Sequence, residues 1–388
     1  MQTAQSLSRF RESIIRDMTR LAMKHGAINM AQGFPDFGTN EIVTEAAVRA
    51  IRDGINQYTV TWGYPPLRQK LAELYTERLG WPVDPDVHVT VTCGVSEAIM
   101  SAVMAVLNPG DEIIILEPAH ENFRPAVLLA HGVPVSVPLE EKSYRIDPER
   151  IAAAITSKTK AILLNTPHNP TGRVFDHTEL EAVIALILEH DLVLMTDEIY
   201  DRILYDGRAH LSPGSIEPLR DRTITMSGLG KSYAITGWRL GHVIAPTQLA
   251  KAVRPVHDFM TICAATPLQA AAVAALELPQ SYYEQMRQDY EQRRAMMMEI
   301  LATAALPATQ PEGAYYVMAD YSHLDIPQAQ LTSIPFAEWM TTEVGVAVVP
   351  GESFYSLPGY GQHSIRFAFC KKLETLAAAA ERMRARLG

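Results

Sequence analysis

The 388-residue sequence has few cysteines: Cys93, Cys263 and Cys370 stand far apart along the chain. An odd number of isolated cysteines argues against a disulfide framework and predicts a reducing compartment. The chain also lacks a charge-free apolar stretch long enough to span a bilayer, and its first residues contain no apolar signal core. We therefore expect a cytoplasmic protein that has no membrane partner.

Positive charge is also in short supply. Lysine and arginine number 34 against 44 aspartate and glutamate residues, and the resulting net charge of −10 is spread along the chain. This balance disfavours nucleic acid and anionic membranes as partners. The sequence has no repeat or low-complexity tract, and 47% of its residues are hydrophobic, which is typical of a globular enzyme.

From about residue 88 onward, short β-branched runs alternate with helical stretches, such as those at 96–107 and 180–190. Strands are expected at 88–92, 112–116, 133–137, 161–164, 193–196, 223–226 and 240–244. Continuous apolar strands separated by helices predict an α/β fold with a largely parallel sheet covered on both faces. Ligands bind at the carboxyl ends of such strands, so motifs that follow several strands should meet at one rim.

Both ends of the chain predict a second, smaller domain. Helices are expected at 9–24, 282–304 and 373–387, and strands of a smaller sheet at 313–320, 344–349 and 364–369. We predict an N-terminal arm and part of the small domain at residues 1–45. A large domain is predicted at residues 46–284 and a small C-terminal domain at residues 285–388.

Lys231 lies eight residues before Arg239 in the glycine-rich segment 228–241. A lysine amine can form a Schiff base with an aldehyde cofactor, and an arginine can hold a phosphate as a planar fork. A complete nucleotide-binding Gly-x-x-x-x-Gly-Lys-Ser loop is excluded because Thr225 stands where that motif needs glycine. A surface lysine in a glycine turn is the alternative for Lys231.

Asp197 follows the buried apolar run 193–195, where an unpaired carboxylate is costly. The protonated nitrogen of a pyridine ring is a suitable partner and would make that ring an electron sink; the alternative is that Asp197 caps the next helix.

Val95 and Ser96 begin a helix whose free N–H groups could bind a phosphate, although Ser96 could be an ordinary N-cap. Taken together with Lys231 and Arg239, these residues predict a pyridoxal-phosphate site.

Three further polar residues are candidates for the same site. Tyr200 and Asn169 could each face the phenolic oxygen of the cofactor; a satisfied core tyrosine and a turn-forming Asn-Pro are the alternatives. Arg366 is a lone arginine in the apolar strand 364–369, and such a charge needs an anionic partner. That partner is either a substrate carboxylate held bidentately or the carboxylate of a buried structural ion pair.

With these motifs in place, the sequence resembles the class I/II aminotransferases, which are fold type I pyridoxal-phosphate enzymes of the aspartate aminotransferase superfamily. Its local pattern is most similar to the kynurenine/glutamine and bacterial aspartate/aromatic branches. The resemblance runs from about Gly33 to Arg366 and rests on the segments 57–58, 63–68, 165–172, 197–200, 228–241 and 349–354. It implies a mostly parallel seven-stranded sheet and a smaller α/β domain built from both chain ends.

The resemblance implies an enzyme that moves an amino group from an L-amino acid to a 2-oxo acid. Lys231 would carry the Schiff base and a pyridoxamine intermediate would form, with no metal. Lys231, Asp197, Tyr200 and His120 would be catalytic. The cofactor would contact Val95, Ser96, His120, Asn169, Asp197, Tyr200, Lys231, Arg239 and Tyr58. The substrate would contact Gly33, Asn169 and Arg366. Tyr58 would reach the phosphate of the neighbouring subunit, which implies a homodimer.

His120 departs from the family pattern, because it stands where an aromatic ring would stack on the cofactor. An imidazole can stack, but it can also titrate and carry a proton. His120 is therefore either a simple ring substitute or a group that redirects the chemistry toward elimination, replacement, cyclisation or oxidation. A regulator that binds the cofactor without catalysis is disfavoured, because no DNA-binding domain is visible and the chain is acidic.

Overall fold

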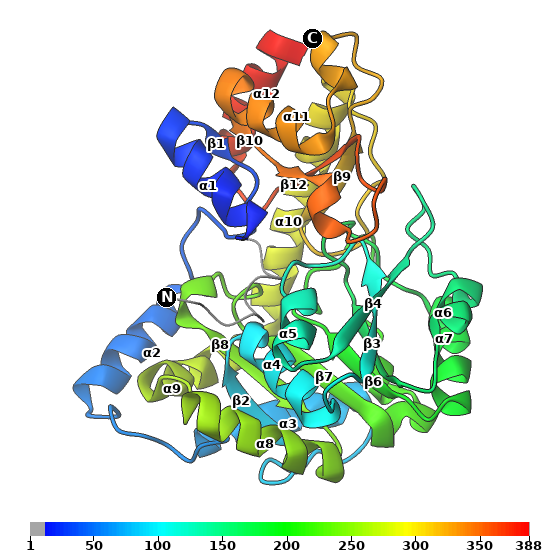
Figure 1. Ribbon diagram of the computed structural model, residues 1–388. Coiled ribbons are helices and arrows are strands. Elements are labelled where there is room, and N and C mark those ends of the chain that lie inside the picture. The colour runs from blue at the N-terminus through cyan, green and yellow to red at the C-terminus, as the bar shows by residue number, and fades with distance from the viewer. Residues whose placement is uncertain (1–11, 388) are drawn as a thin grey trace, which may run out of the picture.

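The computed structural model describes residues 12–387, and its largest element is a seven-stranded sheet (Figure 1). The strands are β2 (Val89–Cys93), β3 (Glu112–Glu117), β4 (Val133–Pro138), β5 (Thr159–Asn165), β6 (Val193–Asp197), β7 (Thr223–Gly228) and β8 (Leu240–Ile244). They lie in the order β2-β8-β7-β6-β5-β3-β4. Pairing is parallel except at β8, which is antiparallel to both of its neighbours. Each predicted strand is present, so the predicted sheet is confirmed.

Helices cover both faces of this sheet because its strands are apolar on both sides. In β3, Ile113 and Ile115 pack with α4 (Val95–Val106), α5 (Phe123–Leu129) and α8 (Thr247–Thr261). The alternating residues Ile114 and Leu116 pack on the other face, against α6 (Pro148–Ala154) and α7 (His177–Glu189). A third cluster joins β2 and β8 to α3 (Pro65–Leu79) and α9 (Thr266–Leu276), and α9 packs against α2 (Glu41–Arg52).

Elements from both ends of the chain lie together above the large sheet in the view of Figure 1. The two-residue strand β1 (Ile28–Asn29) pairs in parallel with β10 (Val346–Ala347). A three-stranded antiparallel sheet has the order β11-β12-β9. The strands and helices of this region are β9 (Tyr316–Asp320), β11 (Val349–Pro350), β12 (Ser364–Ala368), α1 (Ile14–His25), α11 (Ser333–Trp339) and α12 (Leu373–Leu387).

Helix α10 (Gln280–Thr303) extends from the large sheet toward this upper region (Figure 1). Its 24 residues are rich in charged and polar side chains. Across residues 12–387, no helix is long and apolar enough to cross a membrane. The domain boundaries expected after residues 45 and 284 remain predictions, and residues 1–11 of the expected N-terminal arm lie outside the described residues.

Two expected elements differ from the structure. The strand expected at 344–349 is interrupted, because Met340–Val344 forms a π-helical turn that ends at Gly345 with φ 79°. The remaining residues divide between β10 and β11, which belong to different sheets. The helix expected at 9–24 is α1, which begins after the N-cap residue Ser13; residues 9–11 lie outside the described residues. The apolar run at 344–349 did not show that the backbone turns at Gly345.

Two glycines hold the start of β8 against the turn that begins α4. Gly94 has φ 76°, and the guanidinium of Arg239 occupies the space that a Cβ atom on Gly94 would need. A Cβ atom on Gly241 would collide with the backbone of Gly94 and Val95. The close approach of these backbones therefore depends on glycine at both positions.

We expect Gly241→Ala to lower the free energy of unfolding by about 1–3 kcal/mol, because the added methyl group overpacks a backbone contact. Urea unfolding followed by circular dichroism measures the change. Gly237→Ala is the matched control, since its Cβ would meet no atom within 4 Å. The control should stay within about 0.5 kcal/mol of the wild type. Equal stability of both variants would contradict the close packing of β8 on the α4 turn.

Candidate active site

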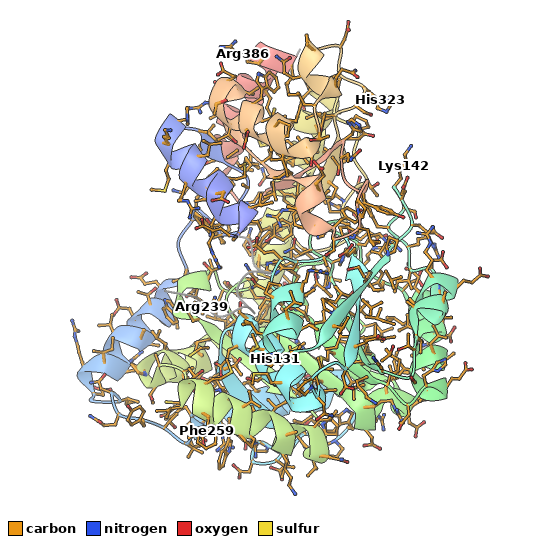
Figure 2. All side chains as sticks on the ribbon, viewed as in Figure 1. His131, Lys142, Arg239, Phe259, His323 and Arg386 are labelled. Carbon is orange, nitrogen blue, oxygen red and sulfur yellow. The ribbon has the colours of Figure 1, made fainter. Side chains whose placement is uncertain are left out.

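A pocket of about 160 Å³ lies at the rim where β5, β6 and β7 end. Most of the site residues expected from the sequence meet there. Figure 2 shows one of them, Arg239, near the upper end of β8. The lining residues are Gly94, Val95, Ser96, Ile99, His120, Asn122, Asn165, Asn169, Asp197, Ile199, Tyr200, Gly230, Lys231, Thr236, Arg239 and Leu240. The topology thus gathers segments that are more than 100 residues apart in the sequence.

Lys231 lies in the turn that follows β7, and its amine points toward the rim. Its Nζ donates a hydrogen bond to the carbonyl oxygen of Gly33 at 3.2 Å. The amine also lies 5.8 Å from the ring centre of Tyr200 and 5.9 Å from that of Tyr315. Burial lowers the pKa of Lys231 to about 8. A lower pKa leaves more of the amine neutral at physiological pH, and the neutral amine is the nucleophile.

Asp197 is the last residue of β6 and is 7% exposed. One carboxylate oxygen accepts a hydrogen bond from the backbone N–H of Ile199 at 3.2 Å. Burial raises the pKa of Asp197 to about 7, and the Ile199 bond and the charge of Lys231 offset this only in part. Within residues 12–387, no cationic side chain lies within 4.0 Å of this carboxylate. The ionised form therefore lacks the close positive partner that a buried carboxylate needs.

The start of α4 forms a cradle for an anion. Gly94 is the N-cap residue and provides no side-chain cap, so the first N–H groups of the helix are free of a capping side chain. The hydroxyl of Ser96 accepts a hydrogen bond from Asn122 Nδ2 at 3.1 Å. Arg239 has φ 55° and places its guanidinium against Gly94. Free N–H groups, a helix dipole and a guanidinium together favour a bound phosphate.

Arg366 on β12 is 1% exposed and has no carboxylate within 4.0 Å across the described residues. It donates hydrogen bonds to Asn169 Oδ1 at 2.9 Å and to the Ala31 carbonyl at 2.5 Å, while its Nε has no partner. Burial lowers the pKa of the guanidinium. The alternative of a structural ion pair is therefore not realised, and the guanidinium keeps donor capacity for an anion.

A tyrosine pair lies between Arg366 and the lysine. The hydroxyls of Tyr200 and Tyr316 are 3.0 Å apart, and the guanidinium of Arg366 lies 4.3 Å from the Tyr316 ring centre. Gly33 passes so close to Tyr316 that a Cβ atom there would overlap the hydroxyl. The close packing therefore needs glycine at position 33. The Gly33 carbonyl accepts hydrogen bonds from the Lys231 amine and from the Tyr315 hydroxyl, the latter at 3.0 Å.

His120 forms part of the pocket wall. Its Nδ1 accepts a hydrogen bond from the backbone N–H of Asn122 at 3.3 Å. Burial lowers the pKa of His120 to about 3, and the positive charges of Arg366 and Lys231 act in the same direction. The ring is therefore neutral at physiological pH, which suits packing against another ring better than proton delivery by an imidazolium.

Three expected site residues do not line the pocket: Gly33 and Arg366 contact the lining residues Lys231 and Asn169, whereas Tyr58 lies on the surface. It belongs to the loop between α2 and α3 and is 77% exposed. Other large hydrophobic side chains are exposed on this loop and at the end of α8, namely Val60, Phe259, Met260 and Ile262. Figure 2 shows Phe259 on the outer surface of α8. The loop is tied to the start of α9, because Thr266 Oγ1 donates to the Gln57 carbonyl at 2.7 Å.

A family model described as aminotransferase class I and II matches residues 25–383. The chain is 36% identical to human kynurenine–oxoglutarate transaminase 1, with 95% of this chain and 94% of the relative covered. It is 34% identical to methionine aminotransferase of Escherichia coli K12, with 96% and 95% covered. The structure of N-succinyldiaminopimelate aminotransferase from Mycobacterium tuberculosis matches with a TM-score of 0.94 at 32% identity, covering 99% of this chain and all of that one.

The chain belongs to the class I and II aminotransferases. Membership confirms the predicted fold type I, the pyridoxal-phosphate cofactor and the transfer of an amino group between amino acids and 2-oxo acids. It also favours transamination over the redirected chemistry that His120 raised as an alternative. The pocket of this aminotransferase fits the cofactor, since it combines an anion cradle, a buried carboxylate without a close cation and a lysine of lowered pKa.

Several residues of the site escaped the sequence analysis. Asn165 ends β5 and ties the rim together: its Nδ2 donates to the Asp197 carbonyl at 2.8 Å, and its Oδ1 accepts from the Asn169 N–H at 2.7 Å. The sequence did contain a signal for Asn165, because it directly follows an expected apolar strand. The same signal identified Asp197. Tyr316 gave no such signal, because only the fold brings β9 to Tyr200.

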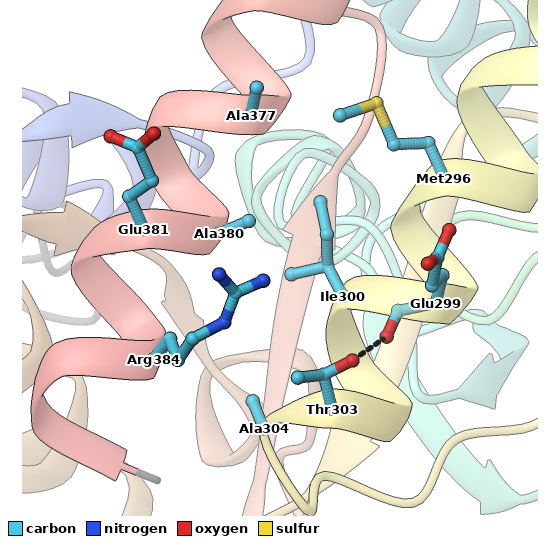
Figure 3. A pocket seen from close by; sticks show the side chains of 9 residues that line it. All are labelled: Met296, Glu299, Ile300, Thr303, Ala304, Ala377, Ala380, Glu381 and Arg384. Atoms are coloured by element: carbon cyan, nitrogen blue, oxygen red, sulfur yellow. Dashed lines mark hydrogen bonds between the residues drawn. The ribbon is translucent and has the colours of Figure 1, made fainter.

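A second hollow of about 240 Å³ lies between α10 and α12 (Figure 3). Its lining is Met296, Glu299, Ile300, Thr303, Ala304, Ala377, Ala380, Glu381 and Arg384. Figure 3 draws a hydrogen bond from the Thr303 hydroxyl to the Glu299 carbonyl within α10. None of the expected site residues borders this hollow.

Burial of Asp197 gives a stability prediction for the cofactor-free aminotransferase. Its pKa rises from 3.8 to about 7 on folding, so the folded chain holds a proton that the unfolded chain releases. The carboxylate therefore destabilises the fold increasingly as the pH rises from about 4 to about 7. We expect Asp197→Asn to raise the free energy of unfolding at pH 7 by about 1–3 kcal/mol. Near pH 4 the gain should vanish.

Urea unfolding of both cofactor-free proteins at the two pH values measures this difference. The asparagine variant should at the same time bind the cofactor more weakly than the wild type, which separates stability from function. A destabilised asparagine variant at pH 7 would contradict the burial argument.

Proposed function

We propose that this aminotransferase uses Lys231 as the residue that bonds to pyridoxal phosphate and then moves the proton from the substrate Cα. The observation that carries the proposal is the position of Lys231 in the rim pocket, with its amine near Gly33, Tyr200 and Tyr315 and its pKa lowered to about 8. A lysine whose pKa lies near the working pH serves both as nucleophile and as general base.

The bound cofactor supplies an electron sink for the negative charge that develops at the substrate Cα. In the proposal, Asp197 keeps a proton on the pyridine nitrogen, because a buried carboxylate favours a positive neighbour. Ser96, the N–H groups beginning at Val95, and Arg239 hold the phosphate at the start of α4. The neutral ring of His120 packs on the cofactor ring.

Arg366 is the proposed anchor for the substrate α-carboxylate. Its unpartnered Nε and its lack of a carboxylate partner within residues 12–387 leave room for a charge-assisted hydrogen bond. Asn169 steadies the guanidinium at 2.9 Å, and both Asn169 and Tyr200 line the pocket that would hold the cofactor. Arg366 donates to the Ala31 carbonyl and Lys231 to the Gly33 carbonyl, so the proposed carboxylate anchor and the amine border the same loop.

We infer a homodimer in which Tyr58 reaches the neighbouring subunit's phosphate. Support comes from the exposed Tyr58 and from the apolar side chains on the adjoining loop and at the end of α8, which are costly to leave in water.

A domain division at residues 45/46 and 284/285 belongs to the proposal as well. So does a cytoplasmic role in amino-acid metabolism, including biosynthesis, which the free thiols of the three cysteines favour.

The proposed activity is tested with the pyridoxal-phosphate-loaded protein, 2-oxoglutarate and one amino acid at a time. Kynurenine and methionine are the first donors to test, because relatives carry these names. Formation of the matching 2-oxo acid with consumption of 2-oxoglutarate, measured by chromatography, supports the proposal. Ammonia release or oxygen uptake without consumption of 2-oxoglutarate would contradict it.

Replacement of Lys231 by alanine should lower the rate of 2-oxo acid formation by about 10²-fold or more, because the general base is lost. Cofactor retention through gel filtration should fall as well. Lys371→Ala is the matched control: Lys371 is buried, and its amine binds the carbonyls of Gln32 and Phe34 on the loop that Lys231 also contacts. The control should keep measurable turnover, and full activity of Lys231→Ala would refute the assignment.

Replacement of His120 by phenylalanine should leave transamination within about tenfold of the wild type, since one ring contact replaces another of about 0.5–1.5 kcal/mol. Replacement by alanine should reduce the rate and the cofactor affinity more, because the ring is lost. Steady-state rates with the best donor measure both variants. If phenylalanine abolishes 2-oxo acid formation as completely as alanine does, His120 acts through its nitrogens and the packing role is wrong.

A further inference from the structure

A buried histidine joins the start of α4 to the loop that carries Tyr58. His257 on α8 is 0% exposed. Its Nδ1 lies 2.5 Å from Glu97 Oε1, and its Nε2 lies 2.7 Å from the backbone carbonyl oxygen of Thr61. Thr61 follows Tyr58 by three residues in the loop 53–64, which connects α2 to α3.

The two partners of His257 determine its protonation. A carbonyl oxygen and a carboxylate oxygen both accept hydrogen bonds, so both ring nitrogens must donate, which only the imidazolium form can do. Burial lowers the pKa of His257, but the hydrogen bond and charge of Glu97, together with the Thr61 carbonyl and the charge of Asp258, outweigh burial and raise it. Asp258 on the same helix acts in the same direction.

Other titratable groups around the pair leave this balance intact. Cys93 on β2 lies near Glu97, and burial raises the pKa of its thiol, so the thiol stays neutral. Arg254, one turn earlier on α8, donates hydrogen bonds to the carbonyls of Asp86 and Val89. The central carbon of its guanidinium lies 4.8 Å from the ring centre of Trp62. Within residues 12–387, the ion pair that His257 forms is the one with Glu97.

Glu97 continues the connection to the anion cradle. Its second oxygen, Oε2, accepts from the backbone N–H of Cys93 at 2.5 Å, and Cys93 directly precedes the N-cap residue Gly94. A line of hydrogen bonds thus runs from Thr61 through His257 and Glu97 to the turn that begins α4. Breaking it at His257 would leave the buried Glu97 carboxylate without a positive partner.

We propose that the His257 imidazolium is a positioning residue for the cofactor phosphate, because it fixes the cradle at α4 and the loop that lends Tyr58 to the neighbouring subunit. The inference rests on the proposed function, in which Val95, Ser96 and Tyr58 contact the phosphate. The loop has further ties at both sides of Thr61, from Thr266 to Gln57 and from Val91 N–H to the Trp62 carbonyl at 2.9 Å. Loss of the histidine bond therefore shifts the loop without unfolding it.

The sign of the pH dependence follows from the raised pKa. The connection is complete at low pH and is lost as the pH rises through the pKa of His257, because the neutral ring can donate to only one of its two partners. In Glu97→Gln, by contrast, a neutral ring can donate from Nε2 to Thr61 and accept at Nδ1 from the glutamine amide. This variant keeps the connection without a charge.

The test measures the dissociation constant of pyridoxal phosphate, by equilibrium dialysis at about pH 6 and about pH 9, for wild type and three variants. His257→Gln should weaken binding about tenfold or more at the lower pH, since a charge-assisted bond is lost. Glu97→Gln should bind like the wild type at the lower pH and better than it at the higher pH. His242→Gln, a matched control at the buried His242–Tyr75 pair, should leave affinity unchanged.

Pyridoxal, which lacks the phosphate, is the second probe, and its affinity should be the same in His257→Gln and wild type. Equal weakening for both probes, equal effects of the two histidine variants, or no effect of His257→Gln would overturn the proposal. If the variants do not fold, amide exchange of residues 58–64 in the wild type decides. After correction for intrinsic rates, exchange should accelerate between the two pH values, and unchanged protection would overturn the proposal.

These results are distinguishable from failure of the proposed function. If Lys231→Ala loses turnover while His257→Gln binds both probes normally, only the positioning role is wrong. If Lys231→Ala keeps full activity, the proposed catalytic site is wrong whatever the affinity measurements show.

Discussion

Three ionisable side chains around one pocket lack a close partner of opposite charge. The rest of the structure holds these three side chains in place. Asp197 and Arg366 are buried, Lys231 is half-buried, and within residues 12–387 no opposite charge lies within 4.0 Å of any of them. Burial shifts all three pKa values toward the neutral form. In the proposed function, a cofactor with a basic ring nitrogen and an aldehyde, and a substrate with a carboxylate, would supply what these groups lack. The site is thereby set up for its ligands at the expense of stability.

The topology explains how the parts meet. Parallel strands β5, β6 and β7 end at one rim and bring Asn165, Asp197 and the Lys231 turn together. The strand β8 runs in the opposite direction, so the residue that precedes it, Arg239, arrives at the same rim. Glycine at positions 94 and 241 lets that arginine lie against the start of α4. The anion cradle is therefore a consequence of one reversed strand and two missing Cβ atoms.

Much of this arrangement could be predicted from the sequence, because the signals are local. Strand ends, the glycine turn around Lys231 and the apolar run before Asp197 all identified rim residues that line the pocket. The sequence does not show which residues that are distant along the chain come into contact in the fold. Nothing local links Tyr316 to Tyr200 or His257 to Thr61, since these pairs are 116 and 196 residues apart. Nor does any local pattern show that Arg366 has no carboxylate within 4.0 Å among residues 12–387, which is the observation that supports its proposed role as substrate anchor.

The central claim is that the covalent bond to the cofactor forms at Lys231. Two lysines approach the same loop, Lys231 at the Gly33 carbonyl and Lys371 at the carbonyls of Gln32 and Phe34, so the claim is specific. The most direct measurement is reduction of the pyridoxal-phosphate-loaded protein with borohydride, followed by mass spectrometry of its peptides. The account predicts that the label is on the peptide that contains Lys231 and no other. A label on Lys371, or one scattered over surface lysines, would contradict it.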